Sequence, residues 1–255
     1  MNSDVKIVTM RTSVLAIFRC ARPILFYSEY PEFPFSICGS GFLVRYHRRV
    51  FAITARHVTA NFDLAHACMQ YHPSVYGFVP MSFRYVFAGG DPSDTDQYDL
   101  VIFEVDGSKL DISLFSDAPP YELSDSEAPP IFDKTSIFVV QGYPSHLHAI
   151  ECETELEAII SRPMLIDAEY AGPCVSDRVH VLRVHCADQI ESFDGMSGAP
   201  VFQVLQSYPN LSKIWFAGMV LRGGTSSGEL RFLERERITE ALTRIIHKDV
   251  VPAKD

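Results

Sequence analysis

The sequence predicts an all-β protein that ends in one amphipathic helix. Short segments rich in Val, Ile and Phe recur along the chain between turn residues, which is typical of strands. The 255 residues include 16 Pro and 14 Gly, and this content favours many turns. Hydrophobic residues make up 47 % of the chain, which is enough to build a sizeable core.

Strands are expected wherever apolar residues gather between two turn signals. These segments are residues 41–45, 50–54, 100–105, 136–141, 179–185, 200–205 and 215–221. Several of them are apolar at successive positions, which is typical of strands buried on both faces. A further run at residues 14–18 is interpreted as a buried strand, because five apolar residues are too few for a secretory signal peptide.

Two features divide the chain into regions. Residues 116–130 hold two Pro-Pro pairs and four acidic residues, so they predict a surface linker between an N-terminal region, 1–115, and a C-terminal region, 131–235. A helix is expected at residues 236–248, where Ile238, Leu242 and Ile245 recur at helical spacing.

Charge and cysteine content exclude several classes of function. Lys and Arg number 22 and Asp and Glu 32, a formal charge of −10, which argues against non-specific nucleic-acid binding. No run of about 18 apolar residues predicts a membrane span. Six cysteines without a Cys-x-x-Cys pair argue against zinc or redox chemistry and favour a reducing, cytoplasmic setting. His146, His148 and Cys152 leave a weak metal-site alternative to a plain loop, and no cofactor is expected.

The chemistry-bearing residues occur in the order histidine, aspartate, serine. Ser197 lies between Gly195 and Gly198, and a serine needs a neighbouring base and an orienting acid to act as a nucleophile. His57 follows one predicted strand, and Asp99 precedes another. The alternatives are a Gly-Ser turn without chemistry and an ordinary strand-end acid.

Other acids and another serine-enzyme fold were weighed against this set. Asp94 and Asp96 compete with Asp99 but lie in a predicted loop, and Asp106 is expected to be an ordinary strand-end acid. The α/β-hydrolases use the order serine, acid, histidine and place a helix after the serine. Here the order differs and a predicted strand follows at Pro200, so that fold is excluded.

Six segments together resemble the trypsin/chymotrypsin family, closest to its disulfide-poor bacterial members. They are residues 39–44 (GSGFLV), 54–57 (TARH), 99–102 (DLVI), 141–144 (QGYP), 195–200 (GMSGAP) and 217–220 (AGMV). The resemblance implies two antiparallel six-stranded β-barrels, followed by the helix, with an active-site cleft between the barrels. It implies an endopeptidase with Ser197 as nucleophile, His57 as general base and Asp99 as orienter. The N–H groups of Gly195 and Ser197 would form the oxyanion hole.

The same resemblance assigns a specificity pocket to Glu191, Ser192 and Gly223. A buried carboxylate at Glu191 would select Arg or Lys, since an unpaired buried charge is costly. The adjacent Arg222 leaves open a pocket rearranged by an ion pair with Glu191. Met196 stands where the secreted enzymes have an acid that pairs with a newly cut N-terminus, so activation by that route is predicted absent.

Two functional classes remain open at this point. The first is a serine endopeptidase that cuts protein or peptide substrates through an acyl-enzyme, as a regulated intracellular bacterial protease in stress or defence. Its control would come from a regulatory protein partner, a proteolytic trigger or a closed oxyanion hole. The second is a catalytically silent module that keeps the cleft to bind peptides, and the intact set of His57, Asp99 and Ser197 favours the enzyme.

Overall fold

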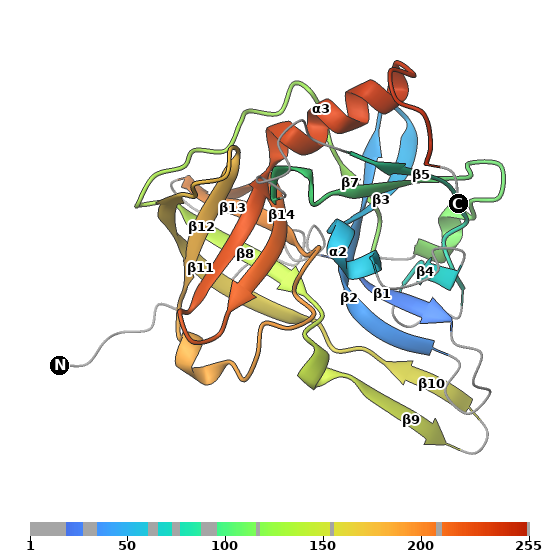
Figure 1. Ribbon diagram of the computed structural model, residues 1–255, viewed down its shortest axis with the longest axis horizontal. Helices are drawn as coiled ribbons and strands as arrows, with labels where there is room; N and C mark the ends of the chain where they lie inside the picture. Colours follow the sequence, from blue (N-terminus) through green and yellow to red (C-terminus); the bar gives the residue numbers. More distant parts are fainter. Residues whose placement is uncertain are drawn as a thin grey trace.

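The fold is all-β, with two β-sheets side by side and one long helix across both (Figure 1). The computed structural model describes residues 19–27, 35–60, 66–72, 77–87, 96–115, 118–153, 156–207 and 211–253, with backbone alone at 149–153, 156–160, 206–207 and 211–213. The strand predicted at residues 14–18 lies outside the described residues.

The N-terminal half forms an open sheet in the order β4-β1-β2-β3-β6-β5, with β7 added parallel to β2. Its strands are β1 (Ala21–Tyr27), β2 (Phe35–Tyr46), β3 (Arg49–Thr54), β4 (Ala67–Met69), β5 (Met81–Val86), β6 (Val101–Val105) and β7 (Tyr121–Glu122). The expected first barrel is therefore a half-barrel. β4 has only three residues, and the chain after it meets the segment before β5 in one isolated bridge, Gln70 to Phe78, instead of a ladder.

The C-terminal half is the closed six-stranded antiparallel barrel that the sequence predicts. Its order is β11-β12-β15-β14-β13-β8, and β8 closes on β11. The strands are β8 (Ile137–Gly142), β11 (Met164–Pro173), β12 (Val179–Val184), β13 (Pro200–Ser207), β14 (Leu211–Gly224) and β15 (Glu229–Glu234). A separate hairpin of β9 (Ala149–Glu153) and β10 (Leu156–Ile160) projects from this half.

The helical elements are short except for the last. They are α2 (Arg56–Thr59) and α3 (Arg235–Ile246), with the 3-10 turns η2 (Asp96–Tyr98), η3 (Ile112–Phe115), η4 (Ser145–Leu147) and η5 (Ala187–Gln189). The helix predicted at 236–248 is thus confirmed with slightly different ends. α3 contacts both halves, because Thr243 Oγ1 lies 2.9 Å from the Tyr46 hydroxyl while the helix packs on β14.

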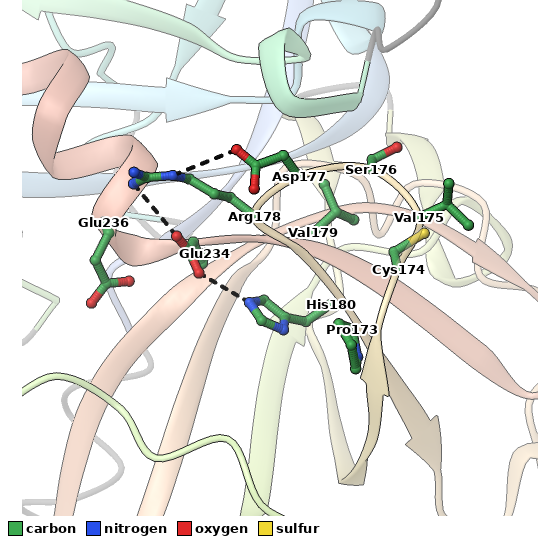
Figure 2. Close-up of a pocket in the computed structure, with 10 residues that line it drawn as sticks. All are labelled: Pro173, Cys174, Val175, Ser176, Asp177, Arg178, Val179, His180, Glu234 and Glu236. Carbon is green, nitrogen blue, oxygen red and sulfur yellow. Dashed lines mark hydrogen bonds and ion pairs between the residues drawn. The ribbon is translucent and has the colours of Figure 1, made fainter.

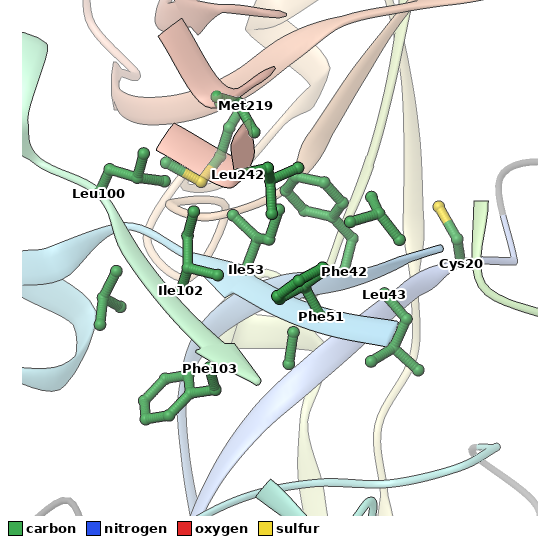
Figure 3. Close-up of a cluster of buried hydrophobic side chains, with 14 of the residues drawn as sticks. Cys20, Phe42, Leu43, Phe51, Ile53, Leu100, Ile102, Phe103, Met219 and Leu242 are labelled. Carbon is green, nitrogen blue, oxygen red and sulfur yellow. The ribbon is translucent and has the colours of Figure 1, made fainter. Parts of the chain in front are cut away.

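The main hydrophobic core draws on both halves of the chain (Figure 3). Phe42, Phe51 and Ile53 of the first sheet are fully buried, as are Met219 of β14 and Leu242 of α3 in the same cluster. Burying a side chain of this size contributes roughly 1.5–3 kcal/mol relative to leaving it in water. The two halves are therefore held together by a shared apolar interior.

The segment predicted as a surface linker is firmly attached where it is described. β7 pairs with β2, and the Leu123 N–H donates to the Arg45 carbonyl at 2.9 Å. The Tyr46 hydroxyl donates to the Asp125 carboxylate at 2.6 Å. Acidic residues of this segment, such as Asp125, thus attach it to the N-terminal sheet.

The cysteines do not form disulfides among the described side chains. Cys20, Cys38, Cys68, Cys174 and Cys186 are free thiols, and Cys152 lies outside this set. Burial raises the pKa of the Cys20 thiol to about 12 and that of Cys68 to about 12, so both stay protonated at neutral pH. Within the ranges described, the chain has no helix whose length and apolar character would let it cross a bilayer.

Candidate active site

Asp99 and His57 form the best-defined pair of the candidate site. The His57 ring donates from Nδ1 to Asp99 Oδ2 at 2.6 Å, and the His57 backbone N–H donates to Asp99 Oδ1 at 2.9 Å. The second bond satisfies a free N–H in the first turn of α2, so Asp99 fixes both the backbone and the ring of His57. The His57 side chain is 49 % exposed and that of Asp99 18 %, which leaves Nε2 facing the open side.

The loop around Ser197 has two glycines in conformations that other residues avoid. Gly195 has φ +89° and Gly198 has φ +87°. A Cβ at Gly198 would lie 1.9 Å from the Ser40 carbonyl oxygen, so this position also needs the space that glycine leaves. These two residues set the path of the chain on either side of the candidate nucleophile.

Two backbone N–H groups of this loop, those of Gly195 and Ser197, are of interest for catalysis. The Asp194 carbonyl accepts a hydrogen bond from the Ser145 N–H at 2.7 Å. Because a trans peptide places its C=O and N–H on opposite sides, the Gly195 N–H faces away from Ser145. Among the described residues, neither the Gly195 N–H nor the Ser197 N–H has an acceptor. Two free N–H groups flanking a serine match the requirements of an oxyanion hole.

Ser40, at the centre of β2, connects the N-terminal sheet to this loop. Its N–H donates to the Ser197 carbonyl at 2.9 Å, and its hydroxyl donates to the Gly195 carbonyl at 2.7 Å. The hydroxyl also accepts from the Tyr143 N–H at 2.8 Å, and the side chain is fully buried. One residue of the first half thus fixes the backbone on both sides of Met196, with its hydroxyl before it and its backbone N–H after it.

Gly39 lies between the Ser197 loop and the residue that follows His57. A Cβ at Gly39 would meet Val58, which follows His57, at 2.8 Å and the Ser197 carbonyl oxygen at 3.3 Å. Within the part of the chain that the structure describes, the Ser197 hydroxyl makes no hydrogen bond to the His57 ring. Such catalytic hydrogen bonds are often long without substrate and shorten when it binds.

Comparison with known proteins adds no relative to this geometry. No protein-family model matches the chain, and no curated protein sequence matches it. The function must therefore be argued from the chain's own residues.

The predicted specificity pocket differs from the expectation in three ways. Glu191 is exposed, so the expected buried carboxylate is not formed. Arg222 pairs with Asp96 of η2 rather than with Glu191. Gly223 is exposed, yet the direction in which a Cβ would point is filled, because that atom would lie 2.6 Å from Leu230 and 2.8 Å from Phe193. Physically, the pairing of β14 with β15 sets Leu230 opposite Gly223 and fills the space that a long side chain would need.

Ser192 and Met196 order the loop from its two ends. The Ser192 hydroxyl accepts the Asp194 N–H at 3.0 Å, which closes a short turn. Met196 is fully buried, and its Sδ and Cε lie 2.8 Å from where a Gly142 Cβ would be. An apolar plug thus occupies the place where the resemblance implies an acid in secreted enzymes.

The metal-site alternative gains no support from the described side chains. The His148 Nε2 lies 3.0 Å from the Tyr143 carbonyl and donates to it, while burial lowers the pKa of this imidazole. No group of three or more potential metal ligands occurs among the described residues. Cys152 belongs to the residues whose side chains are not described.

A surface pocket of about 640 Å³ lies apart from the candidate site, at the turn between β11 and β12 (Figure 2). Most of its charged groups are paired with one another, and Glu236 is the exception, because one of its carboxylate oxygens is buried without a hydrogen-bond partner among the described residues. Arg178 Nη1 lies 3.5 Å from Glu234 Oε1, and His180 Nε2 lies 3.0 Å from Glu234 Oε2. These pairs tie the turn to β15, so the pocket has a structural explanation.

Sequence reasoning missed Ser40 and the Asp96–Arg222 pair. Ser40 was visible as the middle residue of a Gly-Ser-Gly motif, yet the motif carries no sign of which backbone groups the hydroxyl would meet. Asp96 was set aside as a loop acid, and its partner Arg222 lies 126 residues further along the chain. Only the packed fold brings these groups together.

Replacing Ser40 with alanine is expected to lower both stability and reactivity. The change leaves the Tyr143 N–H and Gly195 carbonyl buried without a partner, at a cost of about 1–3 kcal/mol. We expect this loss to appear as a lower melting temperature and as slower modification of Ser197 by a fluorophosphonate. Ser36→Ala on the same strand is the control, and equal behaviour of the two variants would contradict the role assigned to Ser40.

Proposed function

We propose that this protein is a serine endopeptidase that cuts peptide bonds through an acyl-enzyme on Ser197. His57 takes the proton of the Ser197 hydroxyl as the serine attacks the carbonyl carbon, and returns it to the leaving amine. Water then attacks the ester by the same route and releases the acid. Asp99 fixes the proton on His57 Nδ1 and stabilises the imidazolium that forms.

The observation that carries this proposal is the double hydrogen bond from His57 to one carboxylate, Asp99. It leaves the other ring nitrogen, Nε2, free to act as an acceptor. The free N–H groups of Gly195 and Ser197 add a site for the negative oxygen of the tetrahedral intermediate. Each such donor is worth about 10²–10³ in rate.

The edge of β14 offers a binding place for an extended peptide. β13 begins at Pro200, opposite Met219, so residues 221–224 of β14 have no strand on that side among the described residues. An added peptide strand would gain main-chain hydrogen bonds there, beside Ser197. This arrangement favours protein or peptide substrates.

The filled space at Gly223 supports a preference for small side chains at the cleavage point. Leu230 and Phe193 occupy that space, and Glu191 is exposed. An Arg or Lys side chain would find neither the depth nor the buried countercharge that the resemblance implies. We therefore propose cleavage after residues such as alanine in place of the expected Arg or Lys.

The test is covalent labelling of the purified protein with a fluorophosphonate, followed by mapping of the modified residue. Labelling at Ser197 that disappears in Ser197→Ala, and persists in the exposed Ser113→Ala, is the expected result. The side-chain preference of the pocket is then measured with two diphenyl phosphonate probes, one carrying an alanine side chain and one a lysine side chain, by comparing how fast each reacts with Ser197. The alanine probe is expected to react faster, and the reverse order would contradict the filled pocket.

A silent peptide-binding module is the second candidate, favoured by the missing direct hydrogen bond between Ser197 and His57. The two candidates differ in one outcome. If the wild-type protein binds peptides but the fluorophosphonate does not modify Ser197 at any probe concentration, the result favours the binding module over the enzyme.

The setting proposed for this enzyme is the reducing bacterial cytoplasm, with control by a protein partner. The free thiols of the described cysteines agree with a reducing compartment. The apolar plug at Met196 carries no charge that a cut N-terminus would pair with. Control would then act through access to the cleft.

A further inference from the structure

We propose that Arg222 and Arg237 of the C-terminal half act as positioning residues for Asp99, through the short 3-10 turn η2. This inference rests on the proposed function and adds to it the means by which one half of the molecule sets the geometry of the other half's catalytic pair. Asp99 and His57 belong to the N-terminal half, whereas β14 and α3 supply the two arginines.

The first arm of this arrangement is the ion pair between Arg222 and Asp96. The Asp96 side chain is only 8 % exposed, and its Oδ2 accepts a hydrogen bond from Arg222 Nη2. A carboxylate this deeply buried needs a partner, because removing one member of a buried pair leaves an uncompensated charge. Arg222 therefore holds the first residue of η2 against β14.

The second arm is Arg237, in the first turns of α3. Its Nε donates to the Gln97 carbonyl at 3.2 Å, and its guanidinium carbon lies 4.7 Å from the centre of the Tyr98 ring. The Arg237 side chain is 17 % exposed, so both contacts are partly shielded from water. Every residue of η2 is thus contacted by an arginine of the opposite half.

The link from η2 to the catalytic pair is one backbone hydrogen bond. The Asp99 N–H donates to the Asp96 carbonyl at 3.1 Å, which sets where the Asp99 side chain leaves the backbone. Both Asp99 carboxylate oxygens then bind His57. A three-residue 3-10 turn has poor hydrogen-bond geometry of its own, so its shape depends on outside contacts. Neither arginine touches Asp99, and their effect is therefore one of position.

The test measures the His57–Asp99 hydrogen bond and the reactivity of Ser197 in the same set of full-length variants. The set is Arg222→Ala, Arg222→Lys, Asp96→Asn and Arg237→Ala, with the exposed Arg231→Ala on the neighbouring strand as control. Arg237→Ala is expected to change both readouts in the same direction as Arg222→Ala, and wild-type readouts in Arg237→Ala would contradict the role of that residue. The first readout is the far-downfield proton NMR signal of the His57 Nδ1–H, assigned by its loss in Asp99→Asn. The second is the maximal rate and the half-saturating concentration for fluorophosphonate labelling.

We expect Arg222→Ala and Asp96→Asn to broaden or remove the downfield signal and to lower the maximal labelling rate about 10-fold, since small displacements at a reacting centre have effects of this size or larger. The half-saturating probe concentration should stay within twofold, and Arg222→Lys should recover part of both readouts. Arg231→Ala should match the wild type.

Two results would overturn the inference. One is a downfield signal and labelling rate that stay at wild-type values in both Arg222→Ala and Asp96→Asn. The other is a loss confined to Arg222→Ala and to the half-saturating concentration, which would mean that Arg222 contacts the ligand directly. A wild type that gives the downfield signal but no labelling would end the proposed function while leaving the NMR test of positioning intact.

Discussion

Replacing Asp99 with asparagine is expected to slow the labelling of Ser197 by about 10⁴-fold. The amide oxygen of the new side chain can still accept the His57 backbone N–H. Its NH₂ group would then face Nδ1 and donate to it, so the ring proton would move to Nε2. A His57 ring protonated at Nε2 cannot take the proton of the Ser197 hydroxyl. The second-order rate of fluorophosphonate labelling measures this loss.

The matched control for this change is Asp106→Asn, at the other end of β6. The Asp106 carboxylate accepts a hydrogen bond from the Ser108 hydroxyl at 2.6 Å and has no contact with His57. Asp106→Asn should label at the wild-type rate. If the wild type, Asp99→Asn and Asp106→Asn were labelled at equal rates and had equal melting temperatures, Asp99 would have no role in catalysis. Its role would then be limited to capping the first turn of α2.

The largest effect on stability is expected for Gly198→Ala. A Cβ at this position would lie 1.9 Å from the Ser40 carbonyl oxygen and 2.4 Å from Thr54 Oγ1. The backbone φ of +87° adds strain of about 1–3 kcal/mol for a residue with a side chain. Displacement of the surrounding backbone adds a similar amount, about 1–3 kcal/mol. The melting temperature should fall by roughly 10 °C.

Gly107→Ala provides the comparison for Gly198→Ala. Nothing lies within 4 Å of a Cβ built at Gly107. A surface substitution of this kind stays within about 0.5 kcal/mol of the wild type. Thermal unfolding of both variants checks the prediction, and a Gly198→Ala protein as stable as Gly107→Ala would show that the loop can move away from Ser40.

Local pattern was enough to find the helix and seven of the strands, but not β1, β11 or β15, which lie outside the predicted segments. Val50 to Thr54 and Val179 to Val184 are dense in β-branched residues, and both are strands. The sequence could not predict that the first sheet stays open. Closure depends on β4, a strand of only three residues that no sequence pattern marks. The exposure of Glu191 was also out of reach, since it depends on the path of a loop and not on the residue itself.

The candidate site was readable only in its reactive residues. His57, Asp99 and Ser197 stand in local contexts that carry information about their chemistry. The groups that hold them, Ser40 and Arg222, act through contacts between segments more than a hundred residues apart. Such contacts follow from tertiary packing, and the spacing of residues in the sequence does not predict them.

The shared core sets an order of events during synthesis. Phe42 and Phe51 are synthesised long before Leu242, which lies in the same core. A nascent chain holding His57 and Asp99 therefore lacks part of its interior until α3 has emerged. Domains that are complete in themselves can fold as they are made. Here neither half completes its interior alone, so the two halves are expected to become stable together, once α3 has packed on the shared core.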